Sequence, residues 1–125
     1  MKRIAMLAAG ALLASAASLW AQDADLSGRY AVEGSNPGST GIYRGEVTVV
    51  KSDETYQVLW KIGNQQHRGT GILRSGGFSV VYQPPGGGPG VAVYEVRPNG
   101  SLLGLWVDLG GKEVGSEVWN PHDRT

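Results

Sequence analysis

Apolar and polar residues alternate along most of the chain, and a cluster of turn residues follows each alternating run. In 55–62, for example, Tyr56, Val58, Trp60 and Ile62 share one face. Because a β-strand directs successive side chains to opposite faces, this pattern predicts strands with one buried face. We predict eight of them, at residues 27–34, 42–51, 55–62, 65–74, 78–83, 91–97, 101–108 and 112–119.

Most connections between these runs are short, and Asn99-Gly100 is a strong two-residue hairpin signal. Short connections make consecutive strands neighbours in space. An open sheet of eight strands would expose two edges, and closure removes them. We therefore predict an all-β, eight-stranded antiparallel up-and-down β-barrel of the calycin type, with an interior that holds side chains or one small ligand. A β-sandwich of the same strands is the alternative.

Four glycines fall on the predicted apolar faces, at positions 45, 69, 71 and 104. A glycine inside a strand often marks the close approach of another group. We expect aromatic rings to lie flat across the neighbouring backbone at these positions; space for a ligand is the alternative explanation. The side chains predicted to line such a lumen are Tyr43, Trp60, His67, Tyr94 and Trp106.

The first residues have the layout of a secretory signal peptide. A positive start at Lys2 and Arg3 precedes an apolar run over 4–20 and small residues. The run is shorter than the roughly 20 residues that cross a bilayer as a helix. We predict that 1–21 is a cleaved leader, that 22–120 is one barrel domain, that 121–125 is a tail, and that the product is exported, to the periplasm or outside the cell.

Charge and composition narrow the classes of partner. Beyond the predicted leader, nine basic side chains are scattered singly among eleven acidic ones. Nucleic-acid binders carry clustered basic surfaces, so nucleic acid is not expected as a partner. The scattered charge also makes anionic membranes unexpected partners, and we predict no stable membrane insertion. The chain has no cysteine, which excludes disulfides and thiolate metal sites.

Residues suited to catalysis are few. His122 lies in the predicted tail, where nothing is expected to hold it, and His67 is interpreted as a ring packed over glycine. Glu113 and Glu117 fall on one face of the last predicted strand, about 13 Å apart, too far for the carboxylate pair of a retaining or inverting glycosidase, and are interpreted as solvated. We predict no catalytic residue, no metal, no cofactor and no enzymatic activity.

Two glycine- and proline-containing connections stand out as rim loops, and exposed loops on a rigid scaffold often carry binding. The candidate residues are Asn36 and Pro37 in the first loop, and Pro84, Pro85, Gly86, Gly87 and Gly88 in the second.

Three segments together, 27–37, 56–63 and 93–106, resemble a group of small exported bacterial proteins, some of which carry the label "fibronectin-binding protein". The opening Gly28-Arg29-Tyr30 is also similar to the first strand of calycin barrels. The resemblance implies an exported, non-enzymatic binding protein whose partner is an envelope or extracellular macromolecule such as a matrix glycoprotein. The alternatives are a carrier of a small apolar ligand in the barrel lumen and an inhibitor of a secreted hydrolase.

Overall fold

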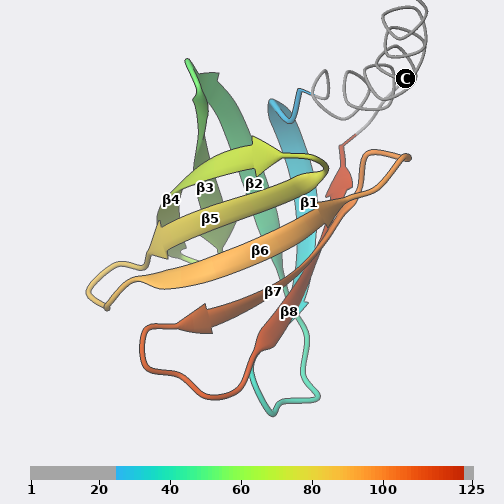
Figure 1. Cartoon of the computed structure of the whole chain (residues 1–125). Coiled ribbons are helices and arrows are strands. Elements are labelled where there is room, and N and C mark those ends of the chain that lie inside the picture. The colour runs from blue at the N-terminus through green and yellow to red at the C-terminus, as the bar shows by residue number, and fades with distance from the viewer. Residues whose placement is uncertain (1–24, 123–125) are drawn as a thin grey trace, which may run out of the picture.

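The alternating segments form eight strands in the computed structural model, which describes residues 25–122 (Figure 1). The predicted leader, 1–21, and the last three residues of the predicted tail lie outside the described residues. The strands are β1 (Gly28–Ser35), β2 (Tyr43–Ser52), β3 (Thr55–Ile62), β4 (Gln65–Arg74), β5 (Gly77–Gln83), β6 (Gly90–Val96), β7 (Leu102–Asp108) and β8 (Gly115–Pro121).

Each strand pairs antiparallel with the next, and β8 pairs with β1, so the sheet closes into an up-and-down barrel. This confirms the predicted fold and rules out the β-sandwich. Closure leaves no sheet edge unpaired. No helix within residues 25–122 is long and apolar enough to cross a membrane.

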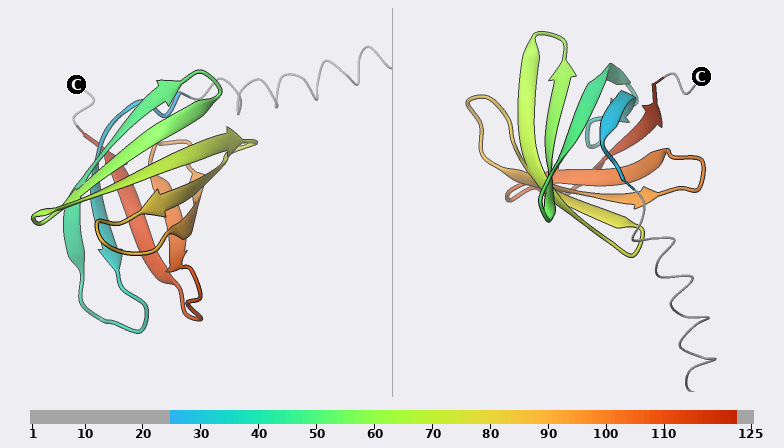
Figure 2. Two further views of the ribbon diagram at one scale, coloured as in Figure 1. Left: turned by 90° about the vertical axis from the view of Figure 1, so that its left-hand side faces the viewer. Right: turned by 90° about the horizontal axis from the view of Figure 1, so that it is seen from above.

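The two ends of the barrel differ. At one end, which we call the closed end, Leu26 precedes β1 and is only 3% exposed. The Tyr30 hydroxyl donates a hydrogen bond to the Leu26 carbonyl oxygen at 2.7 Å, and the Leu26 N–H lies 3.5 Å from the Tyr56 hydroxyl. The other end, which we call the mouth, carries the β1–β2, β3–β4, β5–β6 and β7–β8 connections (Figure 2). A packed core of valines and aromatic rings therefore fills the closed end and leaves the mouth for a site.

Aromatic rings approach glycines on neighbouring strands, as the sequence predicts, at positions 69, 71 and 104, but the prediction is wrong at Gly45, which faces Lys61 and Ile62 instead. Tyr94 covers Gly104, as expected, and Phe78 covers Gly71. Three further rings cover glycines that the sequence did not single out: Tyr43 lies over Gly34, Tyr82 over Gly90, and Trp106 over Gly115. A β-carbon at any of these glycines would overlap the ring, so the glycines are required by packing.

The last strand begins three residues later than predicted, and its inward face is the opposite one. Residues 109–114 form a loop, so β8 starts at Gly115 and Val114 is 54% exposed. Because successive side chains point to opposite faces, an inward Gly115 places every second residue after it inside the barrel. Glu117 and Trp119 consequently point inward, and the prediction that Glu117 is solvated is wrong: its exposed fraction is 6%.

The prediction that nothing holds His122 is also wrong. The His122 N–H donates to the Arg29 carbonyl oxygen at 2.9 Å, and its Nε2 lies 3.2 Å from the Glu46 carboxylate. Pairing of β8 with β1 continues to Pro121, which brings the next residue against the end of β1.

Candidate functional site

A cavity of about 330 Å³ opens at the mouth of the barrel. All five side chains predicted to line a lumen border it, together with Asn36 and Pro84 from the two predicted rim loops. The other candidate rim residues, Pro37, Pro85, Gly86, Gly87 and Gly88, are not among the lining residues. The volume falls at the small end of the range for ligand pockets. The lining residues are Asn36, Tyr43, Trp60, Ile62, Gln65, His67, Tyr82, Pro84, Ala92, Tyr94, Trp106, Asp108 and Glu117.

The strand register builds the floor of this cavity. Glu117 on β8 stands opposite Gly34 of β1 on one side and Gly104 of β7 on the other. Beyond these glycines, Tyr43 of β2 pairs with Gly34, and Tyr94 of β6 pairs with Gly104. One row across five strands therefore reads Tyr43, Gly34, Glu117, Gly104, Tyr94, and we call it the Glu117 row. Because neither glycine has a side chain, each tyrosine lies over its glycine and reaches the central carboxylate from opposite sides.

Four protein donors converge on the Glu117 carboxylate. Its Oε2 accepts a hydrogen bond from the Tyr43 hydroxyl at 2.6 Å. Its Oε1 accepts from the Tyr94 hydroxyl at 2.7 Å, from Trp119 Nε1 at 2.9 Å and from Trp60 Nε1 at 3.2 Å. The two phenol distances match those of charge-assisted O–H···O⁻ bonds. This network orients Tyr43, Trp60 and Tyr94, which form much of the cavity wall.

The two phenols of the row remain protonated over the ordinary pH range. Burial, and then the negative charge of Glu117, raise the pKa of Tyr94 well above its usual value. The same two causes, in the same order, raise the pKa of the half-buried Tyr43. Both hydroxyls therefore act as hydrogen-bond donors to Glu117.

A second tyrosine–glycine–carboxylate arrangement lies at the rim. Tyr82 of β5 pairs with Gly90 of β6, and Gly90 also pairs with Asp108 of β7. The Tyr82 ring covers Gly90, and its hydroxyl donates to Asp108 Oδ1 at 2.7 Å. Burial, followed by this hydrogen bond, raises the pKa of Tyr82. The mouth thus uses one structural device at two carboxylates.

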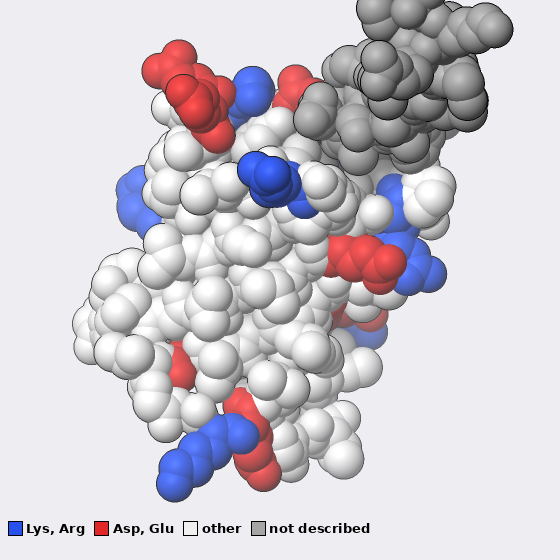
Figure 3. Space-filling model, in the orientation of Figure 1, with Lys and Arg blue, Asp and Glu red and all other residues white. Residues whose placement is uncertain are grey.

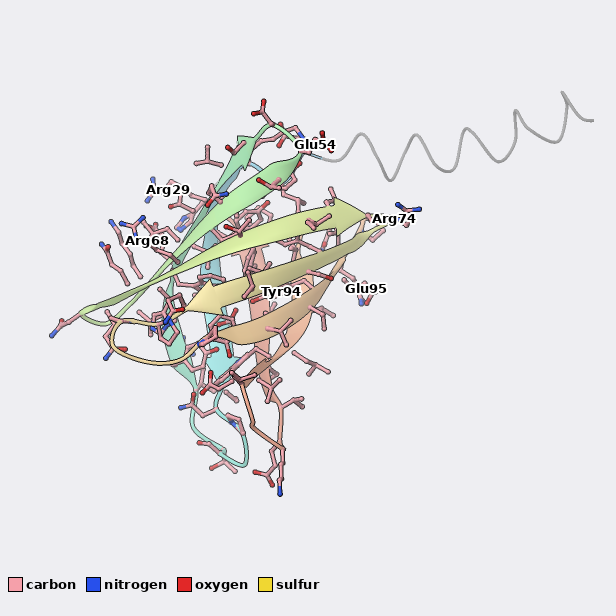
Figure 4. The ribbon with its side chains drawn as sticks, turned by 60° about the vertical axis from the view of Figure 1, so that its left-hand side comes forward. Arg29, Glu54, Arg68, Arg74, Tyr94 and Glu95 are labelled. Carbon is pink, nitrogen blue, oxygen red and sulfur yellow. The ribbon has the colours of Figure 1, made fainter. Side chains whose placement is uncertain are left out.

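Further aromatic contacts tie these groups together. The Tyr82 ring lies edge-on to both Trp106 and Trp60, with centroids 6.3 and 6.2 Å away. Trp119, fully buried, packs against Tyr94 with centroids 4.4 Å apart below the cavity. In Figure 4, Tyr94 lies inside the barrel, while Arg29, Arg68 and Glu95 project outward from the strands.

One polar atom of the wall has no partner. The buried Nε1 of Trp106 makes no hydrogen bond of normal geometry. It lies beside the Tyr43 hydroxyl and lowers the pKa of that phenol slightly against the larger raising effects. Since buried indole N–H groups usually find an acceptor, this donor can serve a bound ligand.

The charge of the cavity is negative. Glu117 and Asp108 contribute carboxylates, and no lysine or arginine is among the lining residues. The ion pairs of residues 25–122 join Arg29 and His122 to Glu46, Arg44 to Glu33, and Arg97 to Glu95, and none includes Glu117 or Asp108. No group of three or more His, Asp or Glu side chains in this part of the chain is arranged to hold a metal ion.

The second rim loop is anchored rather than loosely attached. Gln83 Nε2 donates to the Gly87 carbonyl oxygen, and the Leu109 N–H donates to the Pro89 carbonyl oxygen at 2.9 Å. His67 on β4 stands opposite Trp60 in the register and is half-buried in the cavity wall. The second rim loop and β4 therefore border the cavity entrance in fixed positions.

The sequence did not identify Glu117, Tyr82 or Asp108 as site residues. A usable signal for the inward direction of Glu117 was its alternation with Gly115 and Trp119, whereas its hydrogen-bond partners could not be read from that pattern. Tyr82 ends an alternating strand, as the predicted lumen residues do. Asp108 gave no signal beyond its place at the end of a strand.

No protein-family model matches the chain, and no curated protein matches its sequence. The resemblance to small exported bacterial proteins therefore rests on the three quoted segments alone.

Proposed function

We propose that this protein is a non-enzymatic binding protein that holds a small ligand in the mouth cavity. The observation that carries the proposal is a cavity of about 330 Å³, open to solvent, whose aromatic walls are fixed by the Glu117 network. Ligand sites are typically concave, largely apolar and preformed, with a few placed polar groups. The mouth cavity has each of these properties, which favours the carrier over the other functions that the sequence suggested.

The chemistry of the site supports binding rather than catalysis. The two oxygens of Glu117 already accept four hydrogen bonds from the protein. A carboxylate has about four acceptor positions, so little capacity remains for taking a proton from a substrate. The carboxylate instead holds rings in place, which suits a preorganised binding site.

A panel of small aromatic and aliphatic compounds, cationic, neutral and anionic, tests the proposal by tryptophan fluorescence and thermal unfolding. A ligand at about one hundred times its Kd adds roughly 2.7 kcal/mol to the stability of the native state. For a domain of this size that raises the unfolding midpoint by more than about 10 °C. If no compound of any charge changes either signal, the proposal is wrong.

A matched pair of variants locates the binding. Ala92 borders the cavity and is 1% exposed, while Val91, next to it, faces solvent. Ala92→Leu is expected to fill part of the cavity and weaken ligand binding, after its own stability has been checked. Val91→Leu adds bulk to the outer surface only, and its affinity should equal that of the wild type.

A second candidate function, contact with an extracellular protein, is favoured by a different surface. The outer face of β5, β6 and β7 exposes aliphatic side chains where an outer barrel face is normally polar, and Figure 3 shows few charged groups over its middle. The exposed residues are Val81, Val91, Val93 and Leu105. We propose a matrix glycoprotein as the occupant, following the resemblance of the three segments.

Fibronectin is the partner to test for this second function. Immobilised fibronectin should capture the protein at micromolar concentration, and Val93→Lys should abolish capture without changing ligand binding in the cavity. Absence of capture by the wild type would remove this candidate and leave the first one intact.

A further inference from the structure

The wall of the mouth cavity combines two kinds of group that attract positive charge. Five aromatic side chains border it: Tyr43, Trp60, Tyr82, Tyr94 and Trp106. The faces of such rings carry negative electrostatic potential and bind ammonium groups by cation–π attraction. Two carboxylates, Glu117 and Asp108, lie among the same rings. No cationic lysine or arginine side chain borders the cavity to offset them.

The environment of Glu117 makes this charge balance unusual. Its exposed fraction is 6%, and the ion pairs of the described residues do not include it. Burying a carboxylate without a cation is costly even when hydrogen bonds satisfy its oxygens. A cation in the cavity would supply the missing charge while leaving the four hydrogen bonds in place.

The hydrogen bonds also determine which polar groups of the cavity wall remain available to a ligand. Tyr43 and Tyr94 donate their hydroxyl protons to Glu117, and Tyr82 donates its proton to Asp108. The phenol protons are thus used within the protein, and the phenol oxygens and ring faces remain to meet a ligand. An anionic ligand would meet two carboxylates and negative ring faces, so the wall disfavours it.

From these observations we infer that the ligand of the mouth cavity is a small organic cation, an amine or quaternary ammonium compound held by the aromatic rings and by Glu117 and Asp108. The inference rests on the proposed function and specifies its ligand class. Glu117 acts from the floor, and Asp108 acts from the exposed rim. The unpartnered indole N–H of Trp106 is suited to donate a hydrogen bond to a hydroxyl oxygen or another acceptor of the same ligand.

Two probes of the same shape test the charge directly. Choline carries a quaternary nitrogen where 3,3-dimethylbutan-1-ol carries a carbon, and both carry a hydroxyl. We expect choline to bind at least about tenfold more tightly than the neutral alcohol, in line with cation–π attraction in a partly desolvated site. Acetate, a small anion, should not bind. Titration of tryptophan fluorescence measures all three.

Single substitutions test whether the two carboxylates cause the preference for choline over the neutral alcohol. Glu117→Gln keeps the shape and removes the charge, so choline affinity should approach that of the alcohol, which itself changes little. Asp108→Asn should lower the preference by a smaller factor, because Asp108 is exposed to solvent. Glu95→Gln removes the same charge from the outside of β6 and should leave the preference unchanged (Figure 4). If Glu117→Gln does not fold, Asp108→Asn and Glu95→Gln still decide the result.

The outcomes separate the inference from the proposed function. If the alcohol binds as tightly as choline, or if the preference survives in both cavity variants, the cation inference is wrong. If choline fails but a neutral or anionic compound of the wider panel binds, the cavity is a ligand site for another class. If no compound of any charge binds, the proposed function falls as well.

Discussion

Replacing Glu117 by alanine removes the one acceptor shared by four donors. Trp60, Trp119 and Tyr94 are almost fully buried, so their donors cannot turn to bulk water. Tyr43 is half-buried beside the open cavity and can hydrogen-bond to solvent. Three donors are therefore left without a partner. Each buried unsatisfied donor costs about 1–3 kcal/mol, and water entering through the mouth favours the lower part of that range.

The expected loss of stability for Glu117→Ala is thus about 3–5 kcal/mol, a large fraction of the 5–15 kcal/mol typical of folded domains. Glu117→Gln should cost less, because its carbonyl oxygen can replace Oε1 and accept the same donors. Its amide nitrogen then faces Tyr43, whose hydroxyl can rotate and accept instead of donating. Relief of the buried charge offsets part of what the weaker hydrogen bonds lose.

Urea unfolding, followed by tryptophan fluorescence and by circular dichroism, measures these free energies. Glu113→Ala is the matched control, because Glu113 is an exposed glutamate in the loop just before β8 and should change stability by less than about 0.5 kcal/mol. A loss below about 1.5 kcal/mol for Glu117→Ala would refute the view that Glu117 organises the barrel interior.

Three further predictions follow from the packing and the tyrosine pKa values. Tyr94 should ionise only on unfolding, so stability stays level below about pH 9 and falls above the unfolded pKa of about 10; Tyr94 contributes about 1.4 kcal/mol per pH unit, and the raised pKa values of Tyr43 and Tyr82 make the fall steeper. Phenolate absorbance that rises fully before unfolding would contradict this. Gly104→Val should cost more than about 2 kcal/mol, since a β-carbon there overlaps the Tyr94 ring, whereas Gly88→Ala meets nothing within 4 Å and should be neutral by thermal unfolding. Leu26→Ala should cost about 2–3 kcal/mol in urea unfolding by opening the closed end, and an unchanged midpoint would argue against that plug.

The period-two pattern predicted the barrel because burial of one face repeats at the same spacing in every strand. The five lumen residues were found for the same reason, because each carries a ring and falls on a position that the alternation predicts to point inward. The pattern failed at β8, where it favoured Val114 and Val118 as the inward apolar face, although Val114 lies in the loop before the strand and the inward residues are Gly115, Glu117 and Trp119. Glu117 was consequently placed on the solvent side.

The Glu117 row was beyond the reach of sequence patterns for a further reason. Its members come from five strands, and their meeting depends on the registers of four separate strand pairs. A single strand reveals only which residues share a face, not which residues stand opposite them. Glycines opposite tyrosines become meaningful only when that register is known.

The most direct test of a ligand-binding mouth is the NMR response of the tryptophan indole N–H signals to choline. Trp60 and Trp106 border the cavity, whereas Trp119 lies fully buried below it. We predict large, saturable shifts for the indole signals of Trp60 and Trp106 and a smaller shift for that of Trp119. Indole signals that stay fixed at saturating choline, or changes confined to amides on the outer face of β5–β7, would contradict this prediction.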